Sequence, residues 1–205
     1  MVKNVHWLGH DSFRIDGERT IYIDPWQIAG GPPADVVLIT HDHSDHCSPE
    51  DVTKVSGPDT VIVTIAAAAK KLKGDVRVVK PGDSLTVNGV PIEVLPAYNV
   101  NKQFHPKSAG HVGFIVTIDK QRIYHAGDTD VIPEMDSIQA DIALLPVSGK
   151  YVMTAKEAVQ AAEIIQPKVA IPMHYGAGVA GTIKDAQLFQ EALKGKVEVD
   201  ILPKE

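Results

Sequence analysis

Cysteine, aromatic residues and long apolar runs are all scarce in this chain of 205 residues. A single cysteine, Cys47, excludes an intramolecular disulfide and is typical of a reducing compartment. No apolar run approaches the roughly 20 residues that a membrane-spanning helix needs. The first residues also lack the apolar stretch of a signal peptide. We therefore expect a cytoplasmic protein without a membrane segment.

Basic residues are outnumbered as well, by 26 Asp and Glu to 20 Lys and Arg, for a formal net charge of −6. Such a balance argues against a large nucleic-acid surface. It does not exclude a phosphodiester substrate, because bound metal ions bring positive charge that composition omits. The length and the 44% hydrophobic content suit one globular domain over residues 1–205. Whether the chain forms a homo-oligomer is left open.

Short runs rich in Val, Ile and Thr alternate with turn signals along the chain. Residues 36–39 are apolar at every position, as in a strand buried on both faces. Asn88 and Gly89 form a strong hairpin signal between two strands. Strands are expected at residues 5–15, 20–23, 36–40, 60–64, 76–79, 84–87, 90–96, 112–118, 122–125, 141–147, 168–172 and 197–202.

Four segments predict helices between these strands. Ser48 is an N-cap followed by proline and two acids, and residues 66–73 are strong helix formers. Thr154 begins a capping box whose helix ends before Pro167, and residues 182–193 form the last helix. Sheets covered by helices follow from this order, in an α/β or α+β fold.

Nine histidines stand out in this composition, and their positions decide the chemistry. Residues 40–46 read THDHSDH and follow directly on the buried strand. Alternation in an extended segment places His41 and His43 on the same side, and Asp45 and His46 follow past the next bend. Imidazole and carboxylate groups without thiolate suit zinc, manganese or iron. Ligand sites of open sheets also lie at strand carboxyl ends, so the segment predicts a metal site rather than a solvated loop.

Two later segments supply further candidate ligands, since two metal ions need about three protein ligands each. Asp128 lies in HAGDTD, residues 125–130, after one predicted strand, and His174 lies in PMHYG, residues 172–176, after another. Both segments join a polar residue to a glycine at a strand end, as catalytic loops on rigid scaffolds do.

The HxHxDH motif, the later Gly-Asp-Thr and the late histidine, in this order, resemble the metallo-β-lactamase superfamily. The segments WLGH, YIDP, YHAGDT and PMHY at residues 7–10, 22–25, 124–129 and 172–175 are similar to its small branch of metal-dependent hydrolases. That branch is related to ascorbate-6-phosphate lactonase and to the phospholipase D that cleaves N-acyl-phosphatidylethanolamine. The resemblance covers residues 7–175 and implies a four-layered αββα sandwich with metals at one edge of its two sheets.

The resemblance also implies two divalent ions, Zn²⁺ in the first place and Mn²⁺ as the alternative. The implied ligands are His41, His43 and one later histidine for the first ion, Asp45, His46 and His174 for the second, and Asp128 between the two.

The later histidine is either His105 or His111. Relatives place it shortly after a Pro-Ala pair, whereas residues 96–97 are followed here by Tyr and Asn. We favour His105, because it lies in the loop before the predicted strand and His111 begins that strand.

Five other residues have a functional and a structural interpretation. His10 lies in a Gly-His turn or bulge beside the N-terminal strand and is a proton donor or substrate contact, or a hydrogen-bonded structural histidine. Asp24 orients a ligand histidine or belongs to a simple turn. We expect His125 to support the following aspartate and Cys47 to be a small buried thiol. Lys150 is either a contact for an anionic substrate or a solvated loop residue.

The predicted reaction is hydrolysis of a small ester, lactone or phosphoester by a hydroxide that bridges two metal ions. His10, Asp45 and Asp128 are the candidate catalytic residues, the aspartates as ligands that also carry a proton. Three alternatives stay open: a phosphodiesterase or nuclease with the same metals, a mononuclear iron dioxygenase, and a non-catalytic metal-binding module. The intact Asp45-His46 pair together with His174 favours two metals over one iron.

Overall fold

The computed structural model describes residues 2–205, and its strands form two sheets. The strands of the first sheet are β1 (Val5–Gly9), β2 (Ser12–Ile15), β3 (Ile21–Ile23), β4 (Ala34–Ile39), β5 (Ser56–Thr64) and β6 (Asp75–Val78). Those of the second are β7 (Ser84–Val87), β8 (Val90–Pro96), β9 (Val112–Ile118), β10 (Gln121–His125), β11 (Ile142–Pro146), β12 (Val169–Met173) and β13 (Glu198–Val199). Within each sheet the strands lie in chain order, so neighbours in sequence are neighbours in space. Strands β3 to β6 and β10 to β13 run parallel, which directs their carboxyl ends to one edge of each sheet.

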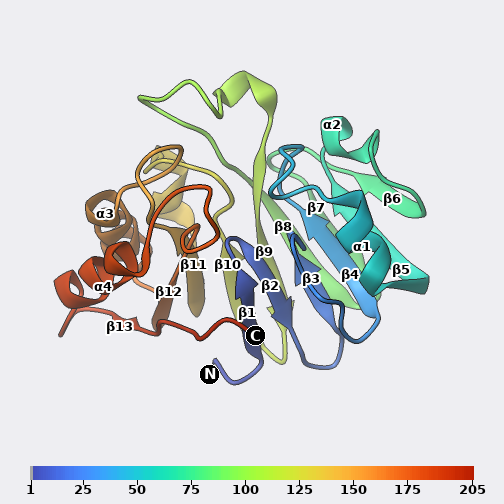
Figure 1. Cartoon of the computed structure of the whole chain (residues 1–205), viewed down its shortest axis with the longest axis horizontal. Helices are drawn as coiled ribbons and strands as arrows, with labels where there is room; N and C mark the ends of the chain where they lie inside the picture. Colours follow the sequence, from blue (N-terminus) through green and yellow to red (C-terminus); the bar gives the residue numbers. More distant parts are fainter. Residues whose placement is uncertain (1) are drawn as a thin grey trace.

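Helices cover the outer sides of the two sheets. They are α1 (Pro49–Val55), α2 (Ala66–Ala69), α3 (Ala155–Ile165) and α4 (Ile183–Ala192), with 3-10 helices η1 (Lys107–Ala109) and η2 (Pro133–Ser137). Figure 1 shows α1 and α2 on one side of the molecule and α3 and α4 on the other. Helix α2 packs on β6, α3 on β11 and α4 on β12. The arrangement is the predicted αββα sandwich. No helix in residues 2–205 is both long and apolar enough to cross a membrane.

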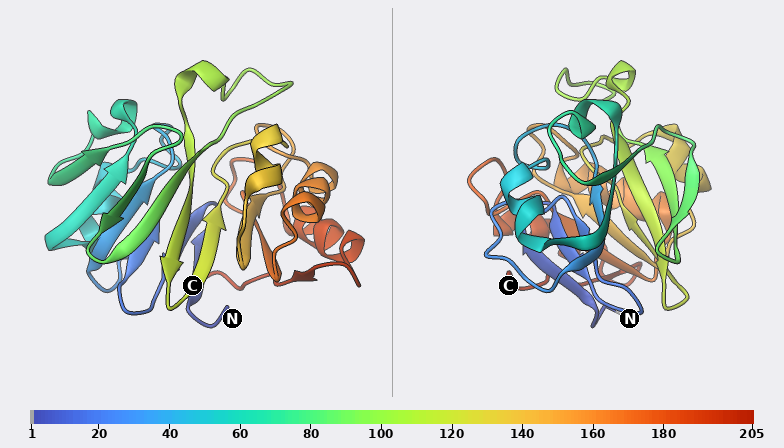
Figure 2. Two further views of the ribbon diagram at one scale, coloured as in Figure 1. Left: turned by 180° about the vertical axis from the view of Figure 1, so that it is seen from behind. Right: turned by 90° about the vertical axis from the view of Figure 1, so that its right-hand side faces the viewer.

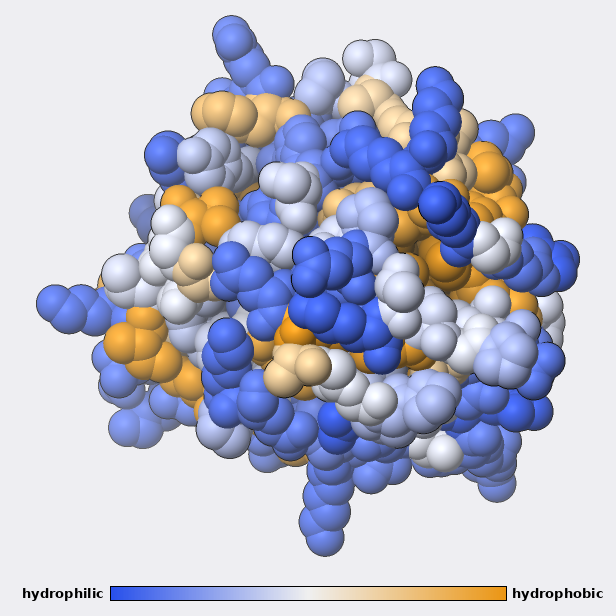
Figure 3. All heavy atoms as spheres, turned by 45° about the vertical axis from the view of Figure 1, so that its right-hand side comes forward, coloured by the Kyte–Doolittle hydropathy of each residue, from blue (hydrophilic) through white to orange (hydrophobic). Residues whose placement is uncertain are grey.

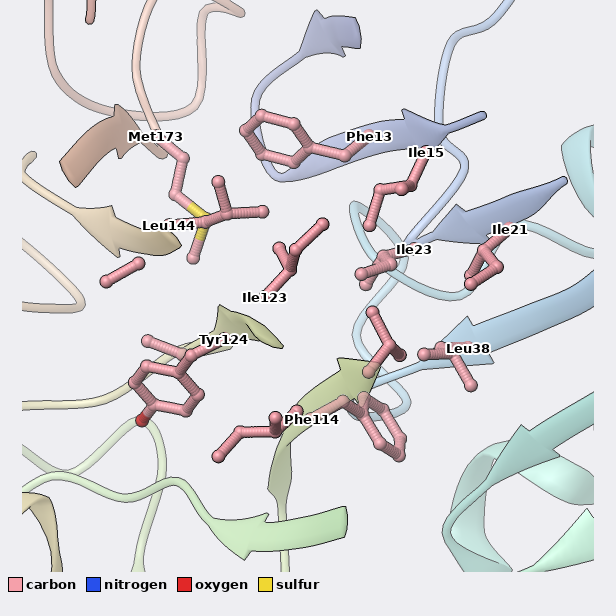
Figure 4. Close-up of a cluster of buried hydrophobic side chains, with 14 of the residues drawn as sticks. Phe13, Ile15, Ile21, Ile23, Leu38, Phe114, Ile123, Tyr124, Leu144 and Met173 are labelled. Atoms are coloured by element: carbon pink, nitrogen blue, oxygen red, sulfur yellow. The ribbon is translucent and has the colours of Figure 1, made fainter. Parts of the chain in front are cut away.

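The core lies between the two sheets. Phe13, Ile23 and Leu38 of the first sheet point toward Phe114 and Leu144 of the second (Figure 4), and all five side chains are fully buried. Removing this apolar surface from water is the main force that holds the sheets together. The packed sandwich therefore provides a rigid base for the loops at its edge.

Charged and polar side chains cover most of the face seen in Figure 3, with smaller apolar areas between them.

Several predicted elements are confirmed, most of all where turn chemistry is explicit. Strands β7, β8 and β9 have the predicted bounds, and Asn88 and Gly89 form the hairpin turn between β7 and β8 with φ of 48° and 84°. Ser48 and Thr154 cap α1 and α3 as predicted, the latter in a capping box.

The single strand predicted at residues 5–15 is wrong. Strands β1 and β2 form an antiparallel hairpin instead, with Gly9 paired to Ser12. The chain reverses because Gly9 and His10 adopt positive φ of 108° and 54°, which agrees with the turn or bulge expected at this Gly-His pair but not with one continuous strand.

Two further elements are shorter than predicted. Helix α2 ends at Ala69, because Ala68 is its one buried residue and a turn without packing does not extend. The last strand keeps two residues beside β12, since the chain then crosses to the first sheet, where Lys204 pairs with Trp7.

Candidate metal centre

Five segments from both sheets meet at one edge of the sandwich. They are the β1–β2 turn, the three segments that follow β4, β10 and β12, and the segment between β8 and β9. The segment between β8 and β9 extends beyond the sheets in Figures 1 and 2. All predicted site residues lie in this region: His10, His41, His43, Asp45, His46, His105, Asp128 and His174.

The first set of candidate ligands is the imidazole group, His41, His43 and His105. His41 Nε2 lies 3.0 Å from His43 Nδ1, which lies 3.2 Å from His105 Nε2. Four ligands at 2.0–2.1 Å around a tetrahedral zinc ion are about 3.3 Å apart, so this spacing suits a shared ion. His41 and His105 are buried, whereas His43 is exposed.

His111 does not join the imidazole group, although it lies beside it. Its ring stacks on that of His41 with centroids 4.7 Å apart, and its Nε2 is 3.9 Å from Asp42 Oδ1. Of the two histidines, His105 is thus the one whose ring nitrogen lies within the imidazole group.

The second set is the carboxylate group, Asp45, His46, Asp128 and His174. Asp128 lies at its centre, with Oδ1 3.4 Å from His46 Nε2 and Oδ2 3.4 Å from His174 Nε2. Asp128 Oδ2 is also 3.1 Å from His105 Nε2, so this carboxylate lies between the two groups. His10 Nε2 lies 3.1 Å from Asp45 Oδ2 and holds the Asp45 carboxylate, which is less buried than that of Asp128.

Unpartnered atoms in the carboxylate group fit bound cations. His46 Nε2, His174 Nε2 and Asp128 Oδ1 are buried, and the part of the chain that the structure describes offers them no hydrogen-bond partner. A buried polar atom without a partner is costly. Divalent ions held by these nitrogen and oxygen atoms would remove that cost, so the residues present fit the metals that the fold implies.

The outer partners of the histidines leave the inward nitrogens free to bind. His46 Nδ1 lies 2.8 Å from Asp24 Oδ2, and His105 Nδ1 lies 3.3 Å from the Tyr151 carbonyl oxygen. A carboxylate or carbonyl only accepts hydrogen bonds, so each Nδ1 is the donor and each Nε2 is the nitrogen left to bind a metal. Asp24 thereby has the orienting role that its sequence position suggested.

His41 is oriented in the same way through one intermediate. Thr40 Oγ1 donates to Asp24 Oδ2 at 2.6 Å and lies 3.0 Å from His41 Nδ1, from which it accepts. The Thr40 amide donates to Asp24 Oδ1 at 2.8 Å. Asp24 consequently supports a candidate ligand in each of the two groups.

The two groups differ in the direction in which their surroundings shift the pKa values of their side chains. Burial lowers the pKa of His41 and of His105, so these imidazoles stay neutral at neutral pH. Burial alone would raise the pKa of Asp128, but His46 and His174 hold it well below its usual value. Burial likewise opposes ionisation of Asp45, yet His10 and His46 lower its pKa to about 2. The imidazole group thus includes two neutral rings, His41 and His105, and the carboxylate group two ionised carboxylates, Asp45 and Asp128.

Left-handed backbone is concentrated at this edge. His10, Asp24 and His174 have φ of 54°, 45° and 62°, a conformation that is uncommon for residues other than glycine. The His174 amide donates to the His10 carbonyl at 3.1 Å, which joins two of these residues. Such strain is stored where the surrounding structure holds a functional side chain in place.

Sequence reasoning missed one acidic residue here, Asp11. It is fully buried beside His46 and His174, and both of its carboxylate oxygens are unpartnered within residues 2–205. Burial raises its pKa. The available signal was an aspartate directly after His10, which the sequence already marks as a candidate site residue.

The residues with two interpretations lie around this centre. His125 Nε2 is 2.9 Å from the Asp11 carbonyl and its Nδ1 accepts from the Gly127 amide, so it braces two loops. Cys47 is buried, and burial raises its pKa to about 11. Lys150 Nζ lies 4.7 Å from the centre of the Tyr151 ring.

A pocket of about 320 Å³ opens over both groups. Apart from candidate ligands and Ser44, it is lined by Trp26, Phe104, Tyr151 and Val179. The rings of Phe104 and Tyr151 meet edge to face, with centroids 4.6 Å apart. None of the described residues that line the pocket is Lys or Arg. The walls are therefore apolar and aromatic, and the floor is polar.

Known proteins share this sequence and fold. A metal-dependent hydrolase of the UPF0173 family from Pyrococcus abyssi is 34% identical over 220 residues, covering 98% of this chain and 96% of the relative. The crystal structure of a metal-dependent hydrolase from Parabacteroides distasonis matches with a TM-score of 0.86 and 36% identity, over 97% of this chain and 91% of that one. A zinc-dependent hydrolase of the metallo-β-lactamase superfamily from Thermotoga maritima matches with a TM-score of 0.67 and 25% identity, over 97% of each chain.

The family model of the β-lactamase superfamily domain matches residues 4–174, the stretch that carries every segment of the centre. With this match and that of the Pyrococcus relative over nearly its whole length, the chain belongs to the metallo-β-lactamase superfamily and is a metal-dependent hydrolase.

Proposed function

We propose that the chain is a dinuclear hydrolase of carbonyl esters, lactones included. The observation that carries this is the set of buried, unpartnered nitrogen and oxygen atoms that converge on Asp128 from two sides. The imidazole group would hold one ion and the carboxylate group the other, with Asp128 between them. Zn²⁺ is our first choice for the metal, with Mn²⁺ as the alternative.

The bound ions would supply a water of lowered pKa and polarise the substrate carbonyl. Asp45 reaches the pocket and is placed to accept the proton of the attacking water. His10 is fully buried, is absent from the described pocket lining and lies beside Asp45. We therefore assign His10 to positioning Asp45 rather than to contact with substrate.

The pocket walls support a carbonyl substrate over a phosphodiester. Trp26, Phe104 and Tyr151 suit an apolar acyl or alkyl group, whereas a phosphate anion is usually held by Arg or Lys. Half of the Phe104 side chain is exposed at the rim, with a fractional exposure of 48%. Its free surface is where an apolar substituent of the substrate would dock.

Metal content and substrate choice test the proposal together. The protein is purified without chelators or a histidine tag, its metals are counted by plasma mass spectrometry, and matched lactones, aryl esters and an aryl phosphodiester are assayed. About two equivalents of zinc or manganese with preferred cleavage of carbonyl substrates would support the proposal. A single equivalent of iron would indicate oxygen chemistry instead. No metal uptake would refute the site, and preferred phosphodiester cleavage would refute the substrate class.

The apolar wall has a test of its own in Phe104→Ala. Removing half-buried aromatic surface should raise KM for long-chain esters by about 3- to 10-fold and leave kcat nearly unchanged. Leu188→Ala on α4, which removes an exposed apolar side chain that does not line the pocket, is the matched control. Equal KM values in the two variants would show that Phe104 does not contact substrate.

A further inference from the structure

Asp11 lies in the β1–β2 turn, which other parts of the site hold in place. Its carbonyl oxygen is 2.9 Å from His125 Nε2. The carbonyl of its neighbour His10 accepts from the Trp7 indole at 2.9 Å and from the His174 amide at 3.1 Å. The backbone is thus fixed on both sides of Asp11, and the side chain stays inside the protein with no exposed surface.

The Asp11 carboxylate faces three imidazoles without bonding to any of them. Its Oδ2 lies 3.5 Å from His46 Nε2 and 3.9 Å from the Nε2 atoms of His10 and His174. These separations are too long for hydrogen bonds. The distance to His46 lies at the upper end of the roughly 3 to 3.5 Å between neighbouring ligands of one ion at 2.0–2.2 Å, and the distances to His10 and His174 are slightly longer.

Asp24 shows how this protein treats a buried carboxylate that lies outside the candidate ligand sets. It is as deeply buried as Asp11, yet it accepts hydrogen bonds from Thr40 and His46 through both oxygens. Asp11 receives none on either oxygen from residues 2–205. Since an unpaired buried carboxylate is costly, a cation is the partner that would account for its place.

We infer that Asp11 is a direct ligand of the metal ion at the carboxylate group, in addition to Asp45, His46, Asp128 and His174. The inference rests on the proposed dinuclear site. A third carboxylate would make this position much richer in oxygen than the imidazole group. Oxygen ligands suit Mn²⁺ better than Zn²⁺ in relative terms, so Asp11 shifts the selectivity of this position toward Mn²⁺.

Equilibrium dialysis of the whole chain against Mn²⁺ alone and Zn²⁺ alone tests the inference in wild type, Asp11→Asn and Asp11→Ala. We expect the second Mn²⁺ to bind at least roughly tenfold more weakly in both variants, with a smaller loss for Zn²⁺. The first ion should bind as in wild type. Asp42→Asn is the control, because it removes one charge from the same edge at a partly exposed position.

Thermal unfolding gives a second readout that does not depend on activity. Without metal, Asp11→Asn should unfold at a higher temperature than wild type, since it lacks a buried carboxyl group that residues 2–205 leave without a hydrogen-bond partner and that is costly to ionise. With saturating Mn²⁺ the order should reverse, because wild type gains more from binding. A purely structural role for Asp11 would lower stability in both states.

Each result decides something separate. Wild-type affinity for both ions in Asp11→Asn would overturn the role of Asp11 and leave the dinuclear site standing. An equal loss for Mn²⁺ and Zn²⁺ would overturn the effect on selectivity. If wild type itself takes up no second ion, the proposed dinuclear site fails before any variant is compared.

Discussion

The imidazole and carboxylate groups lie side by side but differ in charge, depth and origin. The first has neutral rings at His41 and His105 and an exposed ring at His43, and it takes His105 from the segment that extends beyond the sheets. The second is held by strand ends and by backbone in left-handed conformations, and its aspartates are ionised. We expect the carboxylate group to provide charge and rigidity, and the imidazole group to provide access.

The largest change should come from Asp128→Ala, which acts on both groups at once. Asp128 contacts His46, His105 and His174, so we expect loss of most bound metal and a fall in kcat/KM of at least about a thousandfold. Plasma mass spectrometry and ester hydrolysis measure these effects. Asp136→Ala, at an exposed position in η2, is the control. Full activity with two ions in Asp128→Ala would remove Asp128 from the site.

The next largest effect should separate the two groups. His105→Ala should lose about one equivalent of metal from the imidazole group and leave the other ion bound. His111→Ala should keep both ions, because His111 stacks on His41 and stays outside the candidate ligand set. Metal counting on both variants checks this. The opposite order of loss would make His111 the ligand.

Asp24→Asn should moderately weaken metal binding at both groups. Asp24 orients His46 directly and His41 through Thr40, and changes in such outer partners cost about 10- to 100-fold in metal affinity. Asparagine tolerates the left-handed backbone at this position, so the variant tests charge rather than strain. Competition with a chelating dye gives both affinities. A loss of affinity for only one ion would show that Asp24 does not support both groups.

The smallest effect concerns Cys47, which adjoins His46 but which we place outside both groups. Burial raises its pKa to about 11, so at pH 8 the folded thiol should alkylate about 100-fold more slowly than the unfolded one. The rate should rise as the pH passes from 9 toward 11, as the thiolate forms. Iodoacetamide labelling followed by mass spectrometry measures it, with the denatured chain as reference. Fast labelling at pH 8 would indicate a nearby cation that stabilises the thiolate.

Much of the fold could be predicted because its local signals are strong. Caps such as Ser48 and the Asn88-Gly89 turn carry their geometry in the side chains themselves. The hairpin at His10 could not be predicted in the same way. Its positive φ accompanies hydrogen bonds to the His10 carbonyl from nearby Trp7 and from His174, and His174 lies far along the chain.

The candidate site shows the same limit. The histidines and aspartates of residues 40–46 indicate a metal site by composition alone. Asp128 and His174 could be predicted because they follow strand ends. Asp11 gave a weaker sign, because it lies between His10 and Ser12, and a run of polar residues between two apolar segments is also what an ordinary turn contains. The third histidine depended on how a long segment folds back over the sheets, so spacing alone left His105 and His111 open.

The position of Phe104 next to His105 has a consequence for the evolution of this enzyme. One residue lines the apolar wall and the next belongs to the imidazole group, and both lie on the segment between β8 and β9. An insertion or deletion that reshapes the wall for a new substrate would also displace a candidate ligand. Changes of specificity should therefore accumulate as side-chain substitutions at constant segment length, or arise first at Trp26 and Val179, where no neighbouring ligand restrains them.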